Sequence, residues 1–158
     1  LYWDKTFFEQ QKEAFKIQSE LALKHDLPIV IHCRESIDET IELVKPFADR
    51  GLKGVFHCFT GSVEQAELII GMNFKLGLGG VTTFKNGGME PVIKKVSLEH
   101  IILETDSPYL APTPNRGKRN EPVYVKLVAK KIAEVLDKEV EEIGEITSRN
   151  SKNLFKYP

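Results

Sequence analysis

Two histidines and an aspartate have the residue types and the spacing of a metal-binding site. His32, His57 and Asp106 each close a short apolar run that is typical of a β-strand. The histidines are 25 positions apart, and Asp106 follows His57 by 49, close to twice that interval. In parallel α/β folds, ligands bind at the end of the sheet where the strands finish. Imidazoles and a carboxylate at that level indicate a site for a divalent metal ion.

The neighbours of the two histidines decide whether sulfur belongs to this ligand set. Successive residues of a strand point to opposite faces, so Cys33 points away from His32 and Cys58 points away from His57. If the histidines face the inner side of the sheet, both cysteines face the helix layer, where they behave as small buried apolar residues. The candidate ligands are therefore two imidazoles and one carboxylate, without sulfur.

Two carboxylates share one face of the last predicted strand. Glu104 and Asp106 lie on that face, and an unpaired buried carboxylate is costly, so a metal ion would supply the missing partner. A lone histidine at a strand end is more often a hydrogen-bonded core or rim residue than a ligand. His25 and His100 are interpreted as structural in this way, whereas two histidines and an aspartate at one level favour a metal site.

Helix-start patterns and apolar runs alternate along the chain. Three capping boxes, each a Ser or Thr followed three residues later by Glu or Gln, predict helix starts at Thr6, Ser36 and Ser62. These helices are expected to end near His25, Gly51 and Gly71, and further helices are expected over 91–96, 123–136 and 140–155. Strands are expected over 27–32, 54–59, 74–79 and 101–106, followed by a Pro-rich loop over 107–122.

Strands that alternate with helices predict an α/β fold with a parallel sheet. The strands are nearly continuous apolar runs, as expected where both faces of the sheet are covered. The sequence contains no low-complexity segment and no linker between domains. We therefore expect residues 1–158 to belong to a single domain.

The composition excludes several classes of protein. With 41% hydrophobic and 28% charged residues, the chain is expected to be soluble and to bury one core. No apolar stretch approaches the roughly 18 residues of a membrane span. The first residues lack the features of a secretory signal and an initiator Met, so the chain is expected to begin inside a longer protein or to be processed. Two cysteines indicate a reducing compartment, which predicts a cytoplasmic location.

The net charge of −1 provides no overall attraction to nucleic acid, so any contact with a polyanion must be local. The best local candidate is the segment Asn115–Asn120, which has three cations in six positions. A solvated basic loop is the alternative interpretation of such a cluster.

Four motifs, in order, resemble those of the TatD family of metal-dependent deoxyribonucleases. The motifs are PIVIHCR (28–34), HCFTGS (57–62), VSLEHIILETDSPYL (96–110) and RGKRNEP (116–122). Each motif alone would be moderate evidence. Together, with the expected gaps between them, they extend the resemblance over essentially the whole chain.

The resemblance implies a (β/α)8 barrel of the TIM type and a hydrolase that uses divalent metal ions, whether Mg, Mn, Zn or a similar ion. It implies that His32 and His57 ligate one ion, and that Asp106 ligates its neighbour or acts as the catalytic general base. Glu104 would contact the ligand side chains without binding the metal itself. Two ions roughly 4 Å apart would stabilise the attacking and leaving oxygens of a phosphodiester in DNA.

Three arginines are candidates for binding phosphate in such an enzyme. Arg34, Arg116 and Arg119 could hold phosphate oxygens by bidentate hydrogen bonds. Salt bridges at the rim of the barrel are the alternative interpretation of these side chains.

The chain departs from the family pattern in its length and its missing motifs. A full barrel needs eight strands and roughly 200 residues or more, whereas four strands are predicted here. The His-x-His pair of the family's first strand and the metal-bridging glutamate of its fourth strand are absent. We therefore expect the second half of a barrel, four strands plus the C-terminal helices, that buries its open edges against the N-terminal half or a homodimer partner.

Three functions remain open at this point. The first is a TatD-type deoxyribonuclease that cleaves phosphodiester bonds with a metal-activated water and without a covalent enzyme intermediate. The second is a metallohydrolase of the same fold that acts on a small ester, amide or phosphoester, because fold and function are separable. The third is a truncated module without catalytic activity.

Overall fold

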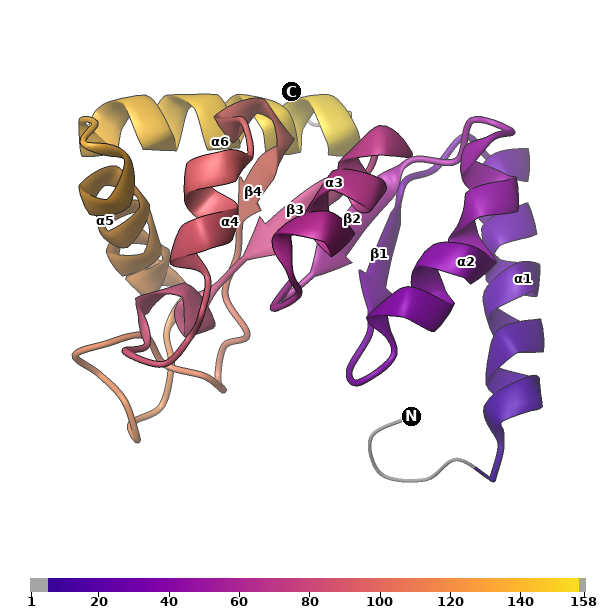
Figure 1. Cartoon of the computed structure of the whole chain (residues 1–158), viewed down its shortest axis with the longest axis horizontal. Helices are drawn as coiled ribbons and strands as arrows, with labels where there is room; N and C mark the ends of the chain where they lie inside the picture. Colours follow the sequence, from indigo (N-terminus) through magenta and orange to yellow (C-terminus); the bar gives the residue numbers. More distant parts are fainter. Residues whose placement is uncertain (1–5, 157–158) are drawn as a thin grey trace.

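A four-stranded parallel sheet lies at the centre of the computed structural model, which describes residues 6–156 (Figure 1). The strands follow one another in space as they do in the sequence, in the order β1-β2-β3-β4. Their bounds are Ile29–His32 for β1, Gly54–His57 for β2, Lys75–Leu78 for β3 and Ile101–Leu103 for β4. The predicted α/β class with four parallel strands is confirmed.

The α-helices cover the sheet in the same sequential order. Consecutive helices are neighbours from α1 to α6, and α6 also packs on β4. Figure 1 shows α1 and α5 at opposite ends of the molecule, with α6 crossing the side where β4 begins. The helices are α1 (Phe8–Lys24), α2 (Ile37–Ala48), α3 (Val63–Gly71), α4 (Glu90–Lys95), α5 (Val125–Leu136) and α6 (Val140–Phe155). In this described part of the chain, no helix is long and apolar enough to cross a membrane.

The two faces of the sheet have different surroundings. Ile31, Phe56 and Leu76 align across β1 to β3, and all three side chains are buried in the core beneath the helices. On the opposite face of β1, the side chain of Val30 is 58% exposed and His32 is also exposed. Because a strand alternates faces, one side of the sheet forms the core and the other side is open at the β1 edge.

The predicted capping boxes have three different outcomes. Ser62 forms a complete capping box with Gln65 at the start of α3, as predicted. Ser36 is the N-cap residue of α2, but its hydroxyl donates to the carbonyl of Arg34 instead of capping the helix. The box predicted at Thr6 is wrong, because α1 begins at Phe8 and its N-cap residue is Phe7.

Within residues 6–156, the loop regions contain three short 3₁₀ helices that the apolar pattern did not predict. They are η1 (Gly80–Thr83), η2 (Leu98–His100) and η3 (Pro122–Tyr124). The predicted fourth strand is also too long, since β4 ends at Leu103 and residues 104–106 continue as irregular backbone. Asp106 therefore belongs to the loop after β4, whose next turn is fixed by a hydrogen bond from the Tyr109 amide to the Asp106 carbonyl.

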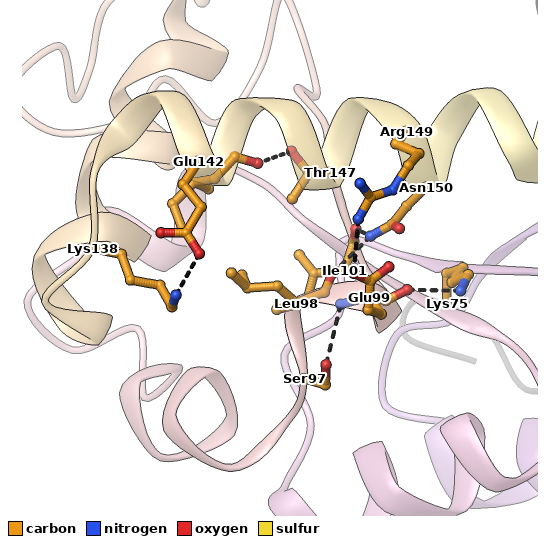
Figure 2. A network of polar contacts seen from close by, with 11 residues as sticks. Lys75, Ser97, Leu98, Glu99, Ile101, Lys138, Glu142, Thr147, Arg149 and Asn150 are labelled. Carbon is orange, nitrogen blue, oxygen red and sulfur yellow. Dashed lines mark hydrogen bonds and ion pairs between the residues drawn. The ribbon is translucent and has the colours of Figure 1, made fainter.

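Polar side chains of α6 attach this helix to the start of β4, as Figure 2 shows. The Asn150 amide, which is 3% exposed, donates to the carbonyls of Leu98 at 2.7 Å and Ile101 at 2.8 Å. Arg149 forms an exposed ion pair with Glu99 at 2.8 Å. The two Asn150 hydrogen bonds satisfy the carbonyls of buried residues beside β4, and a buried carbonyl without a partner would be costly.

Candidate metal centre

The two predicted histidines lie side by side where β1 and β2 end. His32 and His57 are direct partners in the parallel register of these strands. Their ring centroids are 5.8 Å apart and their planes are inclined by 40°. The matched apolar runs that precede each histidine set this register, because the same number of residues separates each histidine from the start of its strand. The structure thus brings together two imidazoles that are 25 positions apart in the sequence.

His57 lies between two carboxylates that come from the segment after β4. Its Nδ1 is 3.0 Å from Oε2 of Glu104, and its Nε2 is 2.9 Å from Oδ1 of Asp106. The three side chains are 17–24% exposed, so water reaches them only in part. The structure therefore gathers four of the predicted residues where the strands end, namely His32, His57, Glu104 and Asp106.

Burial and hydrogen bonds act in opposite directions on Glu104. Burial raises the pKa of this carboxyl above its ordinary value, and the neighbouring His57 imidazole opposes that rise. The backbone amide of Cys58 also donates to Oε1 of Glu104. Glu104 thus accepts hydrogen bonds from the last residue of β2 and from the residue that follows it, and this fixes its carboxylate in one orientation.

The prediction for Cys58 is wrong, while that for Cys33 fits the structure. Cys33 packs against the hydrophobic core, and burial raises the pKa of its thiol to about 11. Cys58 has a positive φ of 48°, so the alternation of a strand stops at His57. The thiol of Cys58 lies beside Asp106, and burial together with the charges of Asp106 and Glu104 raises its pKa to about 12. A thiol with this pKa is protonated at neutral pH and is a poor nucleophile.

One residue that the sequence reasoning missed lies between the two strands that carry the site. Gly77 of β3 is beside His57, and a Cβ atom at Gly77 would lie 2.3 Å from Oε2 of Glu104. The signal in the sequence is the pair of alternating glycines, Gly77 and Gly79, which place no side chain on one face of β3. This empty surface is the space that the Glu104 carboxylate occupies.

The three predicted arginines have different positions. Arg34 is close enough for its charge to lower the pKa of Cys58, against the larger effects that raise it. Arg116 stacks its guanidinium 3.6 Å from the centroid of the Phe84 ring. Arg119 is exposed on the same loop as Arg116. Within residues 6–156, neither Arg116 nor Arg119 forms a hydrogen bond or ion pair with the site.

A groove of about 1060 Å³ opens next to the site, between α1 and α2. His32 and Arg34 line the groove where it meets the site, and Phe8, Phe15 and Ile41 line its apolar part. The groove belongs mainly to the outer helix layer. Glu104, His57 and Asp106 gather where the strands end and do not line this groove.

The donor set fits a divalent metal ion in chemical type. Imidazole nitrogen and carboxylate oxygen are ordinary ligands of Zn²⁺ and related ions. Metal-bound histidines commonly donate their other ring nitrogen to a carboxylate, and the His57–Glu104 contact has this form. In the described part of the chain, however, no group of three or more His, Cys, Asp or Glu side chains is already arranged to hold a metal.

Comparison with known proteins shows the family of this chain. The sequence pattern described as TatD related DNase matches residues 1–156. The chain is 44% identical to YabD of Bacillus subtilis (strain 168), named an uncharacterized metal-dependent hydrolase, over 98% of this chain and 61% of that protein. It is 30% identical to a protein of Pantoea sp. (strain At-9b) named 3'-5' ssDNA/RNA exonuclease TatD, over 94% of this chain and 59% of that protein.

Solved structures show the same relationship. The whole chain superposes on 61% of the Escherichia coli k12 protein YJJV, a TATD homolog, with a TM-score of 0.92 and 30% sequence identity. A TatD family hydrolase from Entamoeba histolytica superposes with a TM-score of 0.79 at 26% identity, over 93% of this chain and 57% of that one. The chain spans about three fifths of the length of these relatives, and its four parallel strands match part of the TatD TIM barrel. The chain belongs to the TatD family of metal-dependent hydrolases.

Proposed function

We propose that this chain forms one side of the active site of a metal-dependent deoxyribonuclease. The observation that carries the proposal is the position of His57 between Glu104 and Asp106, with His32 alongside, where parallel strands end. Active sites of TIM barrels lie at this end of the strands. The family supports metal-dependent hydrolysis, and the relatives named ssDNA/RNA exonucleases support a nucleic-acid substrate.

In this proposal each side chain has a separate task. A bound divalent ion would supply Lewis acidity and would make a water molecule a stronger nucleophile at neutral pH. His32 and His57 would hold one ion, and Asp106 would ligate the neighbouring ion or accept a proton from the attacking water as general base. Glu104 would accept the hydrogen bond from Nδ1 of His57, so that Nε2, which faces Asp106, would be the ligand nitrogen.

The loop after β4 supports a nucleic-acid strand as substrate. Arg116 and Arg119 add positive charge to the exposed loop that follows Asp106, and Arg34 is close enough to act on Cys58, so that all three could bind phosphate. The Arg116 guanidinium already stacks on Phe84, and the Tyr109 ring is 73% exposed. Exposed aromatic rings and stacked arginines bind unpaired bases with little dependence on sequence.

The open sheet supports a second structural element as partner. In the described part of the chain, β1 and β4 are the edges of the sheet, and Val30 is 58% exposed on its inner face. Residues 1–158 would be one portion of a single barrel, completed by an N-terminal half or by a second copy of the chain. We propose a cytoplasmic location for the assembled protein, since both cysteines are free in the structure.

The test is metal affinity and cleavage for a matched pair of variants. Asp106→Ala removes the carboxylate beside His57, and Asp49→Ala removes an exposed carboxylate at the end of α2. We expect Asp106→Ala to lower the affinity for Mn²⁺ or Zn²⁺ by about 100-fold or more and to abolish cleavage of labelled single-stranded DNA. Asp49→Ala should change neither. Cleavage that survives Asp106→Ala overturns the catalytic assignment.

The same assay separates the alternative functions. Faster turnover of a small phosphodiester or ester than of single-stranded DNA would identify a small-molecule hydrolase. A second candidate, a module without activity of its own, is favoured by the absence of a complete three-ligand group within residues 6–156. Metal binding without cleavage by the purified chain, followed by cleavage once the missing barrel half is added, would show that the site is shared between two parts.

A further inference from the structure

Three residues lie next to one another on the inner face beside the site, one each from β2, from β3 and from the segment just after β4. His57 ends β2, and the register Phe56–Leu76 places Gly77 of β3 directly beside it. Gly77 is aligned in turn with Ile102 of β4, and Glu104 lies just beyond the end of β4 with its carboxyl group over Gly77. Glu104 must therefore cross β3 to reach the histidine of β2.

The Glu104 carboxylate lies in the space that a side chain at Gly77 would fill. A Cβ atom at Gly77 would lie 2.3 Å from Oε2, 2.7 Å from Cδ and 3.0 Å from Oε1 of Glu104. Each of these atoms belongs to the carboxyl group that contacts His57. The backbone itself does not require glycine here, because Gly77 has no positive φ and its neighbours form an ordinary strand.

We propose that Gly77 is a positioning residue that acts through Glu104. Its missing side chain allows the carboxylate to pass over β3, accept hydrogen bonds from His57 and the Cys58 amide, and fix which nitrogen of His57 faces Asp106. The inference rests on the proposed function only in its consequence for the metal. The positioning itself is a property of the metal-free protein.

Other glycines of the chain are tightly packed for a different reason. A Cβ atom at Gly54 would lie 2.3 Å from the Ile29 carbonyl oxygen, and one at Gly80 would lie 2.2 Å from the Leu110 carbonyl oxygen. Those contacts involve backbone, so a larger residue would disturb the fold. At Gly77 the nearest atoms are the end of a flexible side chain, which can rotate away. A substitution there should spare the fold and displace Glu104.

Gly77→Ala, Glu104→Ala and the double variant form a cycle that tests the proposal. In metal-free, ¹⁵N-labelled protein, NMR reports the tautomer of His57 and the hydrogen bond of the Cys58 amide. We expect Gly77→Ala to change both signals as Glu104→Ala does, and to add nothing further in the Glu104→Ala background. Gly71→Ala is the control, because a Cβ atom at Gly71 has no neighbour within 4 Å.

Zn²⁺ affinity, measured by competition with a chromophoric chelator, gives the consequence for the site. Gly77→Ala should weaken Zn²⁺ binding by about 10- to 100-fold, with an unfolding midpoint close to that of Gly71→Ala. Unchanged NMR signals in Gly77→Ala, or an effect that persists in full without Glu104, overturn the inference. If the wild-type chain binds no Zn²⁺, the proposed function fails, while the NMR cycle still decides the role of Gly77.

Discussion

The two ends of the sheet use buried polar groups in different ways. Where β4 begins, the Asn150 amide of α6 is bonded to two backbone carbonyls (Figure 2). Where the strands end, His57, Glu104 and Asp106 are bonded mainly to one another. In the first arrangement the Asn150 amide is occupied by backbone carbonyls, so few of its hydrogen bonds could be replaced by a ligand. The second gathers side chains whose partners a metal ion or substrate could replace.

This difference separates stability from chemistry within one small fold. In barrels of this type, the end where the strands begin contributes stability, and the end where they finish carries the active site. Removing a contact at the first end should change the free energy of unfolding and leave metal affinity unaltered. Removing a contact at the second end should do the reverse. The free energy of unfolding and the metal affinity should therefore both be measured for every variant.

The largest effect is expected at Asn150, where the strands begin. Asn150→Ala leaves the carbonyls of Leu98 and Ile101 buried without their donor, so the free energy of unfolding should fall by about 2–3 kcal/mol in urea denaturation. Zn²⁺ affinity should stay the same. Asn153→Ala, an exposed change on the same helix, is the control. Equal stability of the two variants would contradict the structural role of Asn150.

The next effect is expected at the opposite end of the sheet. Glu104→Gln removes the negative charge next to Nδ1 of His57, so Zn²⁺ affinity should fall by about 10- to 100-fold in a chelator competition. The unfolding free energy should change by less than about 1 kcal/mol, because burial already disfavours the charged carboxylate. A large loss of stability at constant Zn²⁺ affinity would assign Glu104 to the fold instead of the site.

A smaller effect tests whether the end where the strands finish also contains purely structural polar groups. Ser62→Ala removes the capping box of α3 and should cost about 1 kcal/mol of unfolding free energy. Ser36 occupies the same N-cap position in α2 without a capping hydrogen bond. Ser36→Ala should therefore lower the free energy of unfolding by only a few tenths of a kcal/mol. Similar values for both serines, measured by thermal unfolding, would show that the cap geometry does not determine stability here.

The smallest effect is expected for the exposed ion pair in Figure 2. Arg149 and Glu99 are both more than half exposed, so Arg149→Ala should lower the unfolding free energy by about 0.5 kcal/mol or less. The difference from the wild type should vanish in 1 M NaCl, because salt screens charges in water. A loss that persists at high salt would mean that the arginine stem contributes packing.

The sequence allows most of the fold to be predicted, because periodicity and helix-start patterns are local. The apolar runs before His32 and His57 identified β1 and β2, and the order of the motifs identified the family. The gathering of the two histidines with Asp106 followed from strand spacing, while their roles in metal binding stay predictions. The box at Thr6 failed because such a pattern shows only that a cap can form, not that it does.

The details of the site depend on geometry that the sequence pattern does not contain. The side on which Cys58 lies is decided by a positive φ at that residue, which ends the alternation that the prediction assumed. Gly77 was not selected because its contribution is an empty space, visible only once Glu104 is placed across β3. Side-chain types in the sequence indicate the chemistry. The direction of each side chain and the space that it occupies are known only from the three-dimensional structure.

The bond between Asn150 and β4 has a consequence for the order in which the molecule is completed. Ribosomes build a chain from its amino end, so Leu98 and Ile101 are made 52 and 49 residues before Asn150. At ordinary synthesis rates this interval lasts roughly 2 to 10 seconds. Until α6 is made, the carbonyls of Leu98 and Ile101 lack this donor, so water must satisfy them.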